Sequence, residues 1–183
     1  MSIGIRMKLQ FNKSFVISGL VMIFIAFLAP MAHQHAAAPF GLLQAHLIGE
    51  VQALLFFTLA FLWPVLNLPK LSLLIGDVSL QLGLWTNMIG TLLIGLLGAG
   101  KEQYIVNQDK IPGLQGFWND VTNLFINLSA YAAIAIIIAL IGVLRKSVPQ
   151  NTGRFVNALS VSLFVLLAIF VIFQTAFPEY SNL

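Results

Sequence analysis

The residues of this chain best suited to chemistry lie together in the stretch 45–53, AHLIGEVQA. It places an imidazole, a carboxylate and a carboxamide in a segment otherwise apolar enough to cross a membrane, where such groups are costly. On a helix, His46 and Glu50 share a face, Gly49 lies beside that face, and Gln52 is turned from His46 by roughly 120°. One imidazole, with a small residue that lets a flat group approach, suggests an axial ligand.

The composition sets the class of protein. Of the 183 residues, 59% are hydrophobic and 8% charged, and the mean hydropathy is +0.94. The apolar residues occur in long runs, so we expect an all-α polytopic membrane helix bundle that forms a single integral membrane domain. Lysine and arginine never cluster beyond a pair, which argues against a nucleic-acid partner. The absence of cysteine excludes thiolate ligands and covalently attached haem.

About five transmembrane helices are expected from the apolar runs. The first run could also be the core of a cleavable signal peptide, but it is long for one, and we expect a span. The predicted spans cover about residues 14–31, 41–66, 71–98, 116–144 and 155–177.

Several polar features accompany these spans. The segment 32–40 is expected to be a loop that holds His33 and His35 as solvated residues, since two histidines without a nearby carboxylate make a weak metal site. The tight connection at 67–70 predicts that the second and third spans are antiparallel neighbours. Residues 99–115 form the longest polar connection. A stripe of asparagines at every fourth position is expected on the outer half of the fourth span: Asn119, Asn123 and Asn127.

The basic residues predict the orientation, because cytoplasmic flanks are enriched in lysine and arginine. With the N-terminus cytoplasmic and the C-terminus outside, only Lys101 and Lys110 of the nine basic residues lie outside. The others would flank the spans on the cytoplasmic side: Arg6, Lys8, Lys13, Lys70, Arg145, Lys146 and Arg154. We expect an integral membrane protein, in the inner membrane if the source is bacterial.

Each polar group also has a structural interpretation. His46 could bond a neighbouring main-chain carbonyl, and Glu50 could be satisfied by a hydrogen bond between helices. Gln52 and Asn87 are individually more typical of contacts between helices than of catalysis. The chain shows no phosphate-binding loop, nucleophile elbow or His-Glu-x-x-His helix, and no broken helix of the kind that transporters use is apparent.

The region from residue 45 to 100 resembles the small membrane isomerase family of styrene oxide isomerases and hydroxylaminobenzene mutases. The resemblance is carried by four elements: Ala45-His46-x-x-Gly49-x-x-Gln52-Ala53, Leu62-Trp63-Pro64-x-Leu66-x-Leu68, Trp85-x-Asn87 and the glycine-rich segment GLLGAG at 95–100. It covers the second and third spans well and the fifth not at all, so the family core would be four helices with an added C-terminal helix. The resemblance implies a homotrimer that binds haem b between subunits, with His46 as the iron ligand and Gly49 beside the cofactor.

The family's chemistry implies a mechanism. Ferric haem acts as a Lewis acid on the oxygen of a small hydrophobic epoxide, the C–O bond opens towards a benzylic cation, and a hydride shift gives the aldehyde. The positions matching the family's catalytic residues are Gln52, where the isomerases have Asn, together with Asn87, and Thr91, where a Tyr is expected. Glu50 has no counterpart and is a further candidate for the site.

Two function classes therefore remain open. The first is a haem b-dependent isomerase that acts on an epoxide or an arylhydroxylamine in the membrane. The second is a non-catalytic haem-binding or accessory membrane subunit, in which Glu50 and Gln52 serve the structure.

Overall fold

The computed structural model describes residues 11–103, 108–144 and 153–176, and every regular element in these ranges is a helix. The predicted all-α membrane bundle is confirmed, because five helical segments are long and apolar enough to cross a membrane. Their bounds lie close to those expected from the apolar runs: Lys13–His35, Pro39–Val65, Lys70–Leu97, Phe117–Leu144 and Gly153–Phe173. The last predicted residue of the fifth span, at position 177, lies outside the described ranges.

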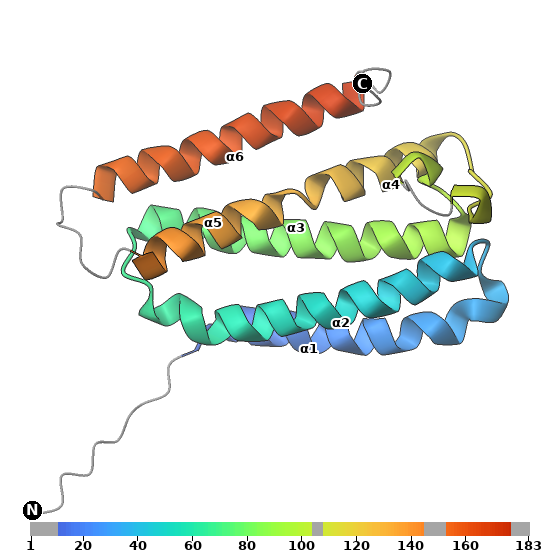
Figure 1. Ribbon diagram of the computed structural model, residues 1–183, viewed down its shortest axis with the longest axis horizontal. Coiled ribbons are helices and arrows are strands. Elements are labelled where there is room, and N and C mark those ends of the chain that lie inside the picture. Colours follow the sequence, from blue (N-terminus) through green and yellow to red (C-terminus); the bar gives the residue numbers. More distant parts are fainter. Residues whose placement is uncertain (1–10, 104–107, 145–152, 177–183) are drawn as a thin grey trace, which may run out of the picture.

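Helices α1 (Lys13–Leu28) and α2 (Pro39–Leu62) form an antiparallel pair at one side of the bundle (Figure 1). Asn12 caps α1 by accepting hydrogen bonds from the main-chain amides of Ser14 and Phe15. After α1 the chain continues as the 3₁₀ helix η1 (Ala29–His35), whereas a loop was expected from residue 32. Pro30 lacks an amide hydrogen and cannot extend the α-helical bonding, which favours the tighter 3₁₀ turn.

Helix α3 (Lys70–Leu97) is the centre of the bundle and contacts every other long helix. After the short 3₁₀ helix η2 (Trp63–Val65), α3 returns antiparallel to α2, as predicted. Glycines allow close approach where the two helices meet. A Cβ on Gly41 would lie 2.7 Å from the main-chain nitrogen of Gly95, and α3 ends at Gly98 with a φ of 69°.

The fourth span lies where it was predicted but is interrupted in its middle, an interruption that was not apparent from the sequence. It consists of α4 (Phe117–Leu128) and α5 (Tyr131–Leu144), separated by a turn at residues 129–130 (Figure 1). The amides of Ala130, Ala132 and Ala133 bond to carbonyls three residues earlier, as in a 3₁₀ turn. The main chain of Ala132 lies against Gly83 of α3, where an added Cβ would overlap it. The missing side chain at position 83 therefore makes room for the break.

Helix α6 (Gly153–Ala176) packs against α3, α4 and α5. Ser72 of α3 donates a 2.8 Å hydrogen bond to Asn157 of α6. Tyr131, the first residue of α5, meets the ring of Phe164 edge-on at a centroid distance of 4.9 Å. The fifth span is thus held by α3 and by both halves of the fourth span.

A partly exposed polar network joins α1 to α3. The side-chain oxygen of Gln81 accepts hydrogen bonds from Ser18 at 2.8 Å and from the indole of Trp85 at 3.2 Å, and its nitrogen donates to Ser14 at 3.1 Å. Within the Gln81 carboxamide, the oxygen accepts two hydrogen bonds and the nitrogen donates one, which offsets the cost of placing this group among apolar helices.

The basic residues within the described ranges separate to the two ends of the bundle. Helices α1, α3 and α6 begin at the same end (Figure 1), which brings Lys13, Lys70 and Arg154 to that end. Lys101, in η3 (Lys101–Gln103), and Lys110, in η4 (Gln108–Lys110), follow the opposite end of α3. Arg6, Lys8, Arg145 and Lys146 lie outside the described ranges. The side of the membrane that each end faces stays a prediction.

Candidate functional site

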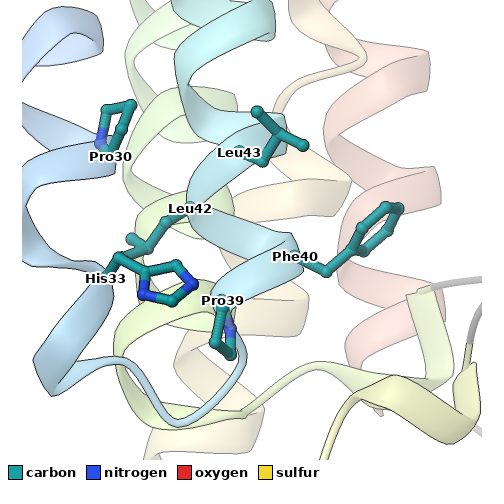
Figure 2. A pocket seen from close by; sticks show the side chains of 6 residues that line it. All are labelled: Pro30, His33, Pro39, Phe40, Leu42 and Leu43. Atoms are coloured by element: carbon teal, nitrogen blue, oxygen red, sulfur yellow. The ribbon is translucent and has the colours of Figure 1, made fainter.

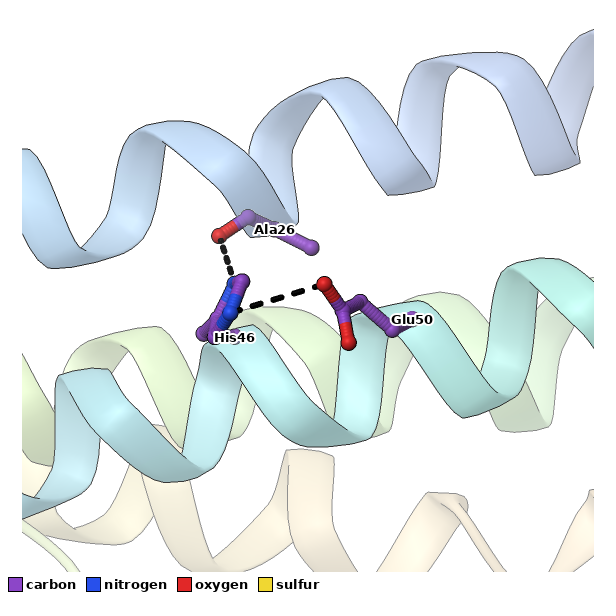
Figure 3. A network of polar contacts seen from close by, with 3 residues as sticks. All are labelled: Ala26, His46 and Glu50. Carbon is purple, nitrogen blue, oxygen red and sulfur yellow. Dashed lines mark hydrogen bonds and ion pairs between the residues drawn. The ribbon is translucent and has the colours of Figure 1, made fainter.

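His46 lies between α1 and α2, and both of its ring nitrogens have partners (Figure 3). Its Nδ1 atom is 3.0 Å from the main-chain oxygen of Ala26, and its Nε2 atom is 3.4 Å from Oε1 of Glu50, one turn further along α2. The ring of Phe27 lies beside the imidazole, with centroids 5.7 Å apart. The structure therefore brings together the two residues expected to share a face.

The hydrogen bond to Ala26 determines which ring nitrogen of His46 carries a proton. A carbonyl oxygen only accepts, so Nδ1 of His46 carries a proton and donates it. Nε2 is then the nitrogen that can offer a lone pair, either to a metal or to a proton shared with Glu50. Histidines that bind metals commonly donate their second ring N–H to a main-chain carbonyl, which fixes the ring.

Both side chains remain partly exposed at the edge of the bundle. The exposed fractions are 23% for His46 and 35% for Glu50, and their neighbours Leu47 and Val51 on α2 are exposed at 54% and 66%. In a membrane this surface would face lipid, which is unfavourable for a polar pair. The pair accordingly requires a cover, which a cofactor or another subunit could supply.

Gly49 packs towards the interior of the bundle. A Cβ at this position would lie 2.7 Å from Cβ of Ala26 and 3.1 Å from Cε of Met88. The glycine allows α1 to approach α2 closely, which brings the Ala26 carbonyl within reach of His46. In the single chain, its close neighbours are thus protein side chains, and its expected place beside a cofactor stays a prediction.

Two further candidates for catalysis, Gln52 and Thr91, lie deeper than His46 and Glu50. Gln52 has 5% of its surface exposed, and its Oε1 atom has no hydrogen-bond partner among the described residues. Thr91 has 2% exposed and donates to the main-chain oxygen of Asn87 at 2.8 Å, as a threonine in a helix commonly does. Gln52 and Thr91 are thus buried within the bundle, while His46 and Glu50 lie at its edge.

Asn87 is half-buried on the α3 face that carries Gly83 and Gly90, which are four residues before and three after it. Those glycines contact Ala132 and Ile126 of the fourth span. Asn87 therefore lies on the side of α3 that faces the break in the fourth span, and the hydrogen bond, ion pair and ring contact found for His46 within the described residues involve Ala26, Glu50 and Phe27.

Two of the asparagines of α4 have side-chain oxygens that are buried in the bundle. Asn119 is buried and accepts a 2.8 Å hydrogen bond from the main-chain amide of Gly100. The Oδ1 atom of Asn123 is buried without a partner among the described residues. Asn119 thereby ties the start of α4 to the end of α3.

Two features of this part of the molecule were not predicted from the sequence. The Ala26 carbonyl carried no signal, because any main-chain oxygen can accept a hydrogen bond. His33 is exposed, as expected for a solvated residue, but it lies in η1 and not in a loop, and it lines an apolar pocket at the start of α2 (Figure 2). Its position between Pro30 and Pro39 was the one available indication, since prolines at both ends restrict how the connection can turn.

Among the described residues, no three side chains of the kinds that bind metal ions come together. The arrangement at His46 supplies one nitrogen ligand with a fixed orientation, which suits a group whose other ligands are its own, as in haem. His46 therefore offers one candidate ligand atom, Nε2, which in this structure faces Glu50.

No protein-family model, no curated protein and no solved structure matches this chain.

Proposed function

We propose that this chain is a haem b-dependent membrane isomerase that rearranges a small hydrophobic epoxide or an arylhydroxylamine. The proposal rests on the resemblance of residues 45–100 to the styrene oxide isomerase and hydroxylaminobenzene mutase family. One observation of the structure supports it most: the His46 ring is fixed by the Ala26 carbonyl and directs Nε2 to a partly exposed edge of the bundle.

The residues near the proposed haem would have different roles. His46 would hold the iron through Nε2, and Glu50, now 3.4 Å from that atom, would turn away to make room. When bound, ferric haem supplies a Lewis acid for the substrate oxygen. The protein would exclude water and orient the substrate, a role that the apolar side chains of α1 and α2 can serve.

We further propose that the chain forms a homotrimer with haem between subunits. A second copy would cover the His46–Glu50 pair, which a single chain leaves partly exposed at 23% and 35%. The N-terminus would be cytoplasmic and the C-terminus outside, in a bacterial inner membrane. Mass measurement of the detergent-solubilised protein tests the assembly, and a clean monomer would remove the basis for a haem shared between subunits.

A second candidate, a non-catalytic haem-binding or accessory subunit, is favoured by a different observation. Gln52 and Thr91, which stand where the family has its catalytic Asn and Tyr, are buried away from His46. Haem ligation needs only His46, whereas isomerisation needs further groups near the substrate.

The two candidates are separated by two measurements on the purified protein. A Soret band in the visible spectrum establishes haem. Conversion of styrene oxide to phenylacetaldehyde, followed by gas chromatography, establishes the isomerase. A haem-loaded protein that turns over neither styrene oxide nor phenylhydroxylamine supports the accessory subunit, and a protein that binds no haem contradicts both.

A further inference from the structure

An apolar pocket lies where η1 turns into α2 (Figure 2). Its volume is about 280 Å³. Five of its six lining residues are apolar, and the sixth is a histidine: Pro30, His33, Pro39, Phe40, Leu42 and Leu43. Neither the proposed haem ligand nor any candidate for catalysis lines it.

The pocket lies next to the site at His46. Leu42 and Leu43 precede His46 by four and three residues, which places all three on neighbouring parts of one α2 face, about 5 Å apart along the helix axis. On the opposite wall, Pro30 follows Ala26 by four residues, and Ala26 is the hydrogen-bond partner of His46. The pocket and the His46 ring therefore lie between the same two chain segments, one helical turn apart.

We propose that this pocket binds a small, mostly apolar molecule that carries an oxygen atom, and that His33 donates a hydrogen bond to that oxygen. The volume is near the lower end of the range for ligand pockets, about 300 Å³, which suits a molecule the size of a substituted benzene. A sugar or an ion would need several polar partners, and the lining offers one imidazole. An imidazole carries at least one N–H in either charge state, so His33 can always donate.

The pocket lies about one helical turn from His46 along α2, and Pro30 on its other side lies four residues after Ala26, the hydrogen-bond partner of His46. As a binding site it stands on its own lining, whereas its role as the route of the substrate to His46 rests on the proposed function. The chemical class that it fits, an apolar body with one oxygen, includes the epoxides and arylhydroxylamines proposed above.

The binding of 4-fluoroacetophenone, an unreactive aromatic ketone, tests the proposal. Its ¹⁹F NMR signal is titrated with the full-length protein in detergent micelles, without haem and with haem added. Saturable binding is expected in both samples.

Leu43→Trp should fill the pocket and weaken binding by about tenfold or more, because the enlarged side chain competes for the same space. Leu47→Trp is the matched control. Leu47 is one turn further along α2 and is exposed to the same degree, 54% against 51% for Leu43, but does not line the pocket. It should leave the affinity unchanged. If the Trp variant of Leu43 does not purify as a folded protein, Leu43→Phe replaces it.

The hydrogen bond is tested at the histidines. His33→Leu removes the donor at similar volume and should weaken binding by about three- to tenfold, the range for one hydrogen bond. His35→Leu, two residues away and not part of the lining, should have no effect.

Three outcomes would overturn the proposal. Equal binding to the two Trp variants would show that the ketone only partitions into the micelle. Equal binding to the two Leu variants would show an occupant without a polar contact, such as an acyl chain. The third outcome combines two results: the unmodified protein shows no saturable binding, and Leu43→Trp changes the mass of the oligomer. Together they would show that a second copy covers the pocket. Ketone binding in a protein that takes up no haem would support the pocket and contradict the proposed function alone.

Discussion

The imidazole of His46 on α2 is held by the main-chain oxygen of Ala26 on α1, at 3.0 Å from Nδ1. Gly49 makes this contact possible, because an added Cβ would lie 2.7 Å from Cβ of Ala26. The orientation of the ring and the close packing of the two helices are therefore parts of one arrangement.

His46→Ala should abolish the Soret band of the protein or shift it, because the proposed iron ligand is removed. His35→Ala should leave the spectrum unchanged, since His35 is an exposed residue at the end of η1 and is not the proposed ligand. Visible spectra of the two purified variants, at equal protein concentration and with equal added haem, provide the comparison. A wild-type spectrum in His46→Ala would remove the basis of the site.

Glu50→Gln should keep haem but raise its reduction potential. A carboxylate close to the iron ligand favours the ferric form, and the neutral amide does not. If the charge favours the ferric form about tenfold, the increase is about 60 mV for this one-electron couple. Spectroscopic redox titration measures it. An unchanged potential would contradict an electrostatic effect of Glu50 on the iron, even from the rotated position proposed above.

Gly83→Ala should destabilise the protein, because the added methyl group would overlap the main chain of Ala132 at the break in the fourth span. The expected loss is about 1–3 kcal/mol, as for other overpacked sites. Gly153→Ala is the control, since the nearest atom to its added Cβ is 3.7 Å away. Thermal unfolding of both variants in the same detergent gives the difference, and equal midpoints would contradict the close contact.

The Gln81 network should contribute measurable coupling between α1 and α3. Gln81→Met and Ser18→Ala each remove the 2.8 Å hydrogen bond between these residues, so the double variant should be less destabilised than the sum of the two. The expected coupling is about 0.6 kcal/mol, the average for such bonds in membrane bundles, with an upper limit near 1.7 kcal/mol. Strictly additive effects in steric-trapping or denaturation measurements would show that the contact adds no stability.

The two ends of the bundle should face opposite sides of the membrane. The natural sequence has no cysteine, so one introduced cysteine reports one position. Asn67→Cys, in the connection before α3, should react with an impermeant maleimide only from the cytoplasmic side, and Asp109→Cys, in η4, only from outside. Reaction of both from the same side would contradict the alternation of the spans, and the reverse pattern would contradict only the orientation.

The spans could be predicted because each is a long uncharged run, and hydropathy alone determines where a chain can cross a bilayer. The break at residues 129–130 could not, because Ser129 and Ala130 are tolerated within helices and 117–144 reads as one segment. What accompanies the break is a tertiary contact with Gly83, more than 40 residues earlier in the chain. A glycine in α3 gives no local indication of which distant main chain it accommodates.

At the candidate site, the four-residue spacing correctly brought His46 and Glu50 together on one face. The depth of the other candidates depended on rotation about the helix axes. Gln52 is buried because its side of α2 faces into the bundle. The sequence could not predict which side of α2 faces inward, because apolar residues occur on every side of this helix. The place of His33 depended on how η1 folds back onto α2, a property of the connection and not of any periodic pattern.

The broken fourth span also bears on how the protein is made. Its halves, of 12 and 14 residues, are about 18 and 21 Å long, and neither alone crosses a hydrocarbon core of about 30 Å. α5 is rich in isoleucine and alanine, so its transfer into lipid is favourable. α4 carries Asp120 and three asparagines, which make its transfer into lipid unfavourable. We therefore expect α4 to require α3, already in the membrane, as its partner for insertion. Asn119, bonded to Gly100 at the end of α3, marks where that partnership would begin.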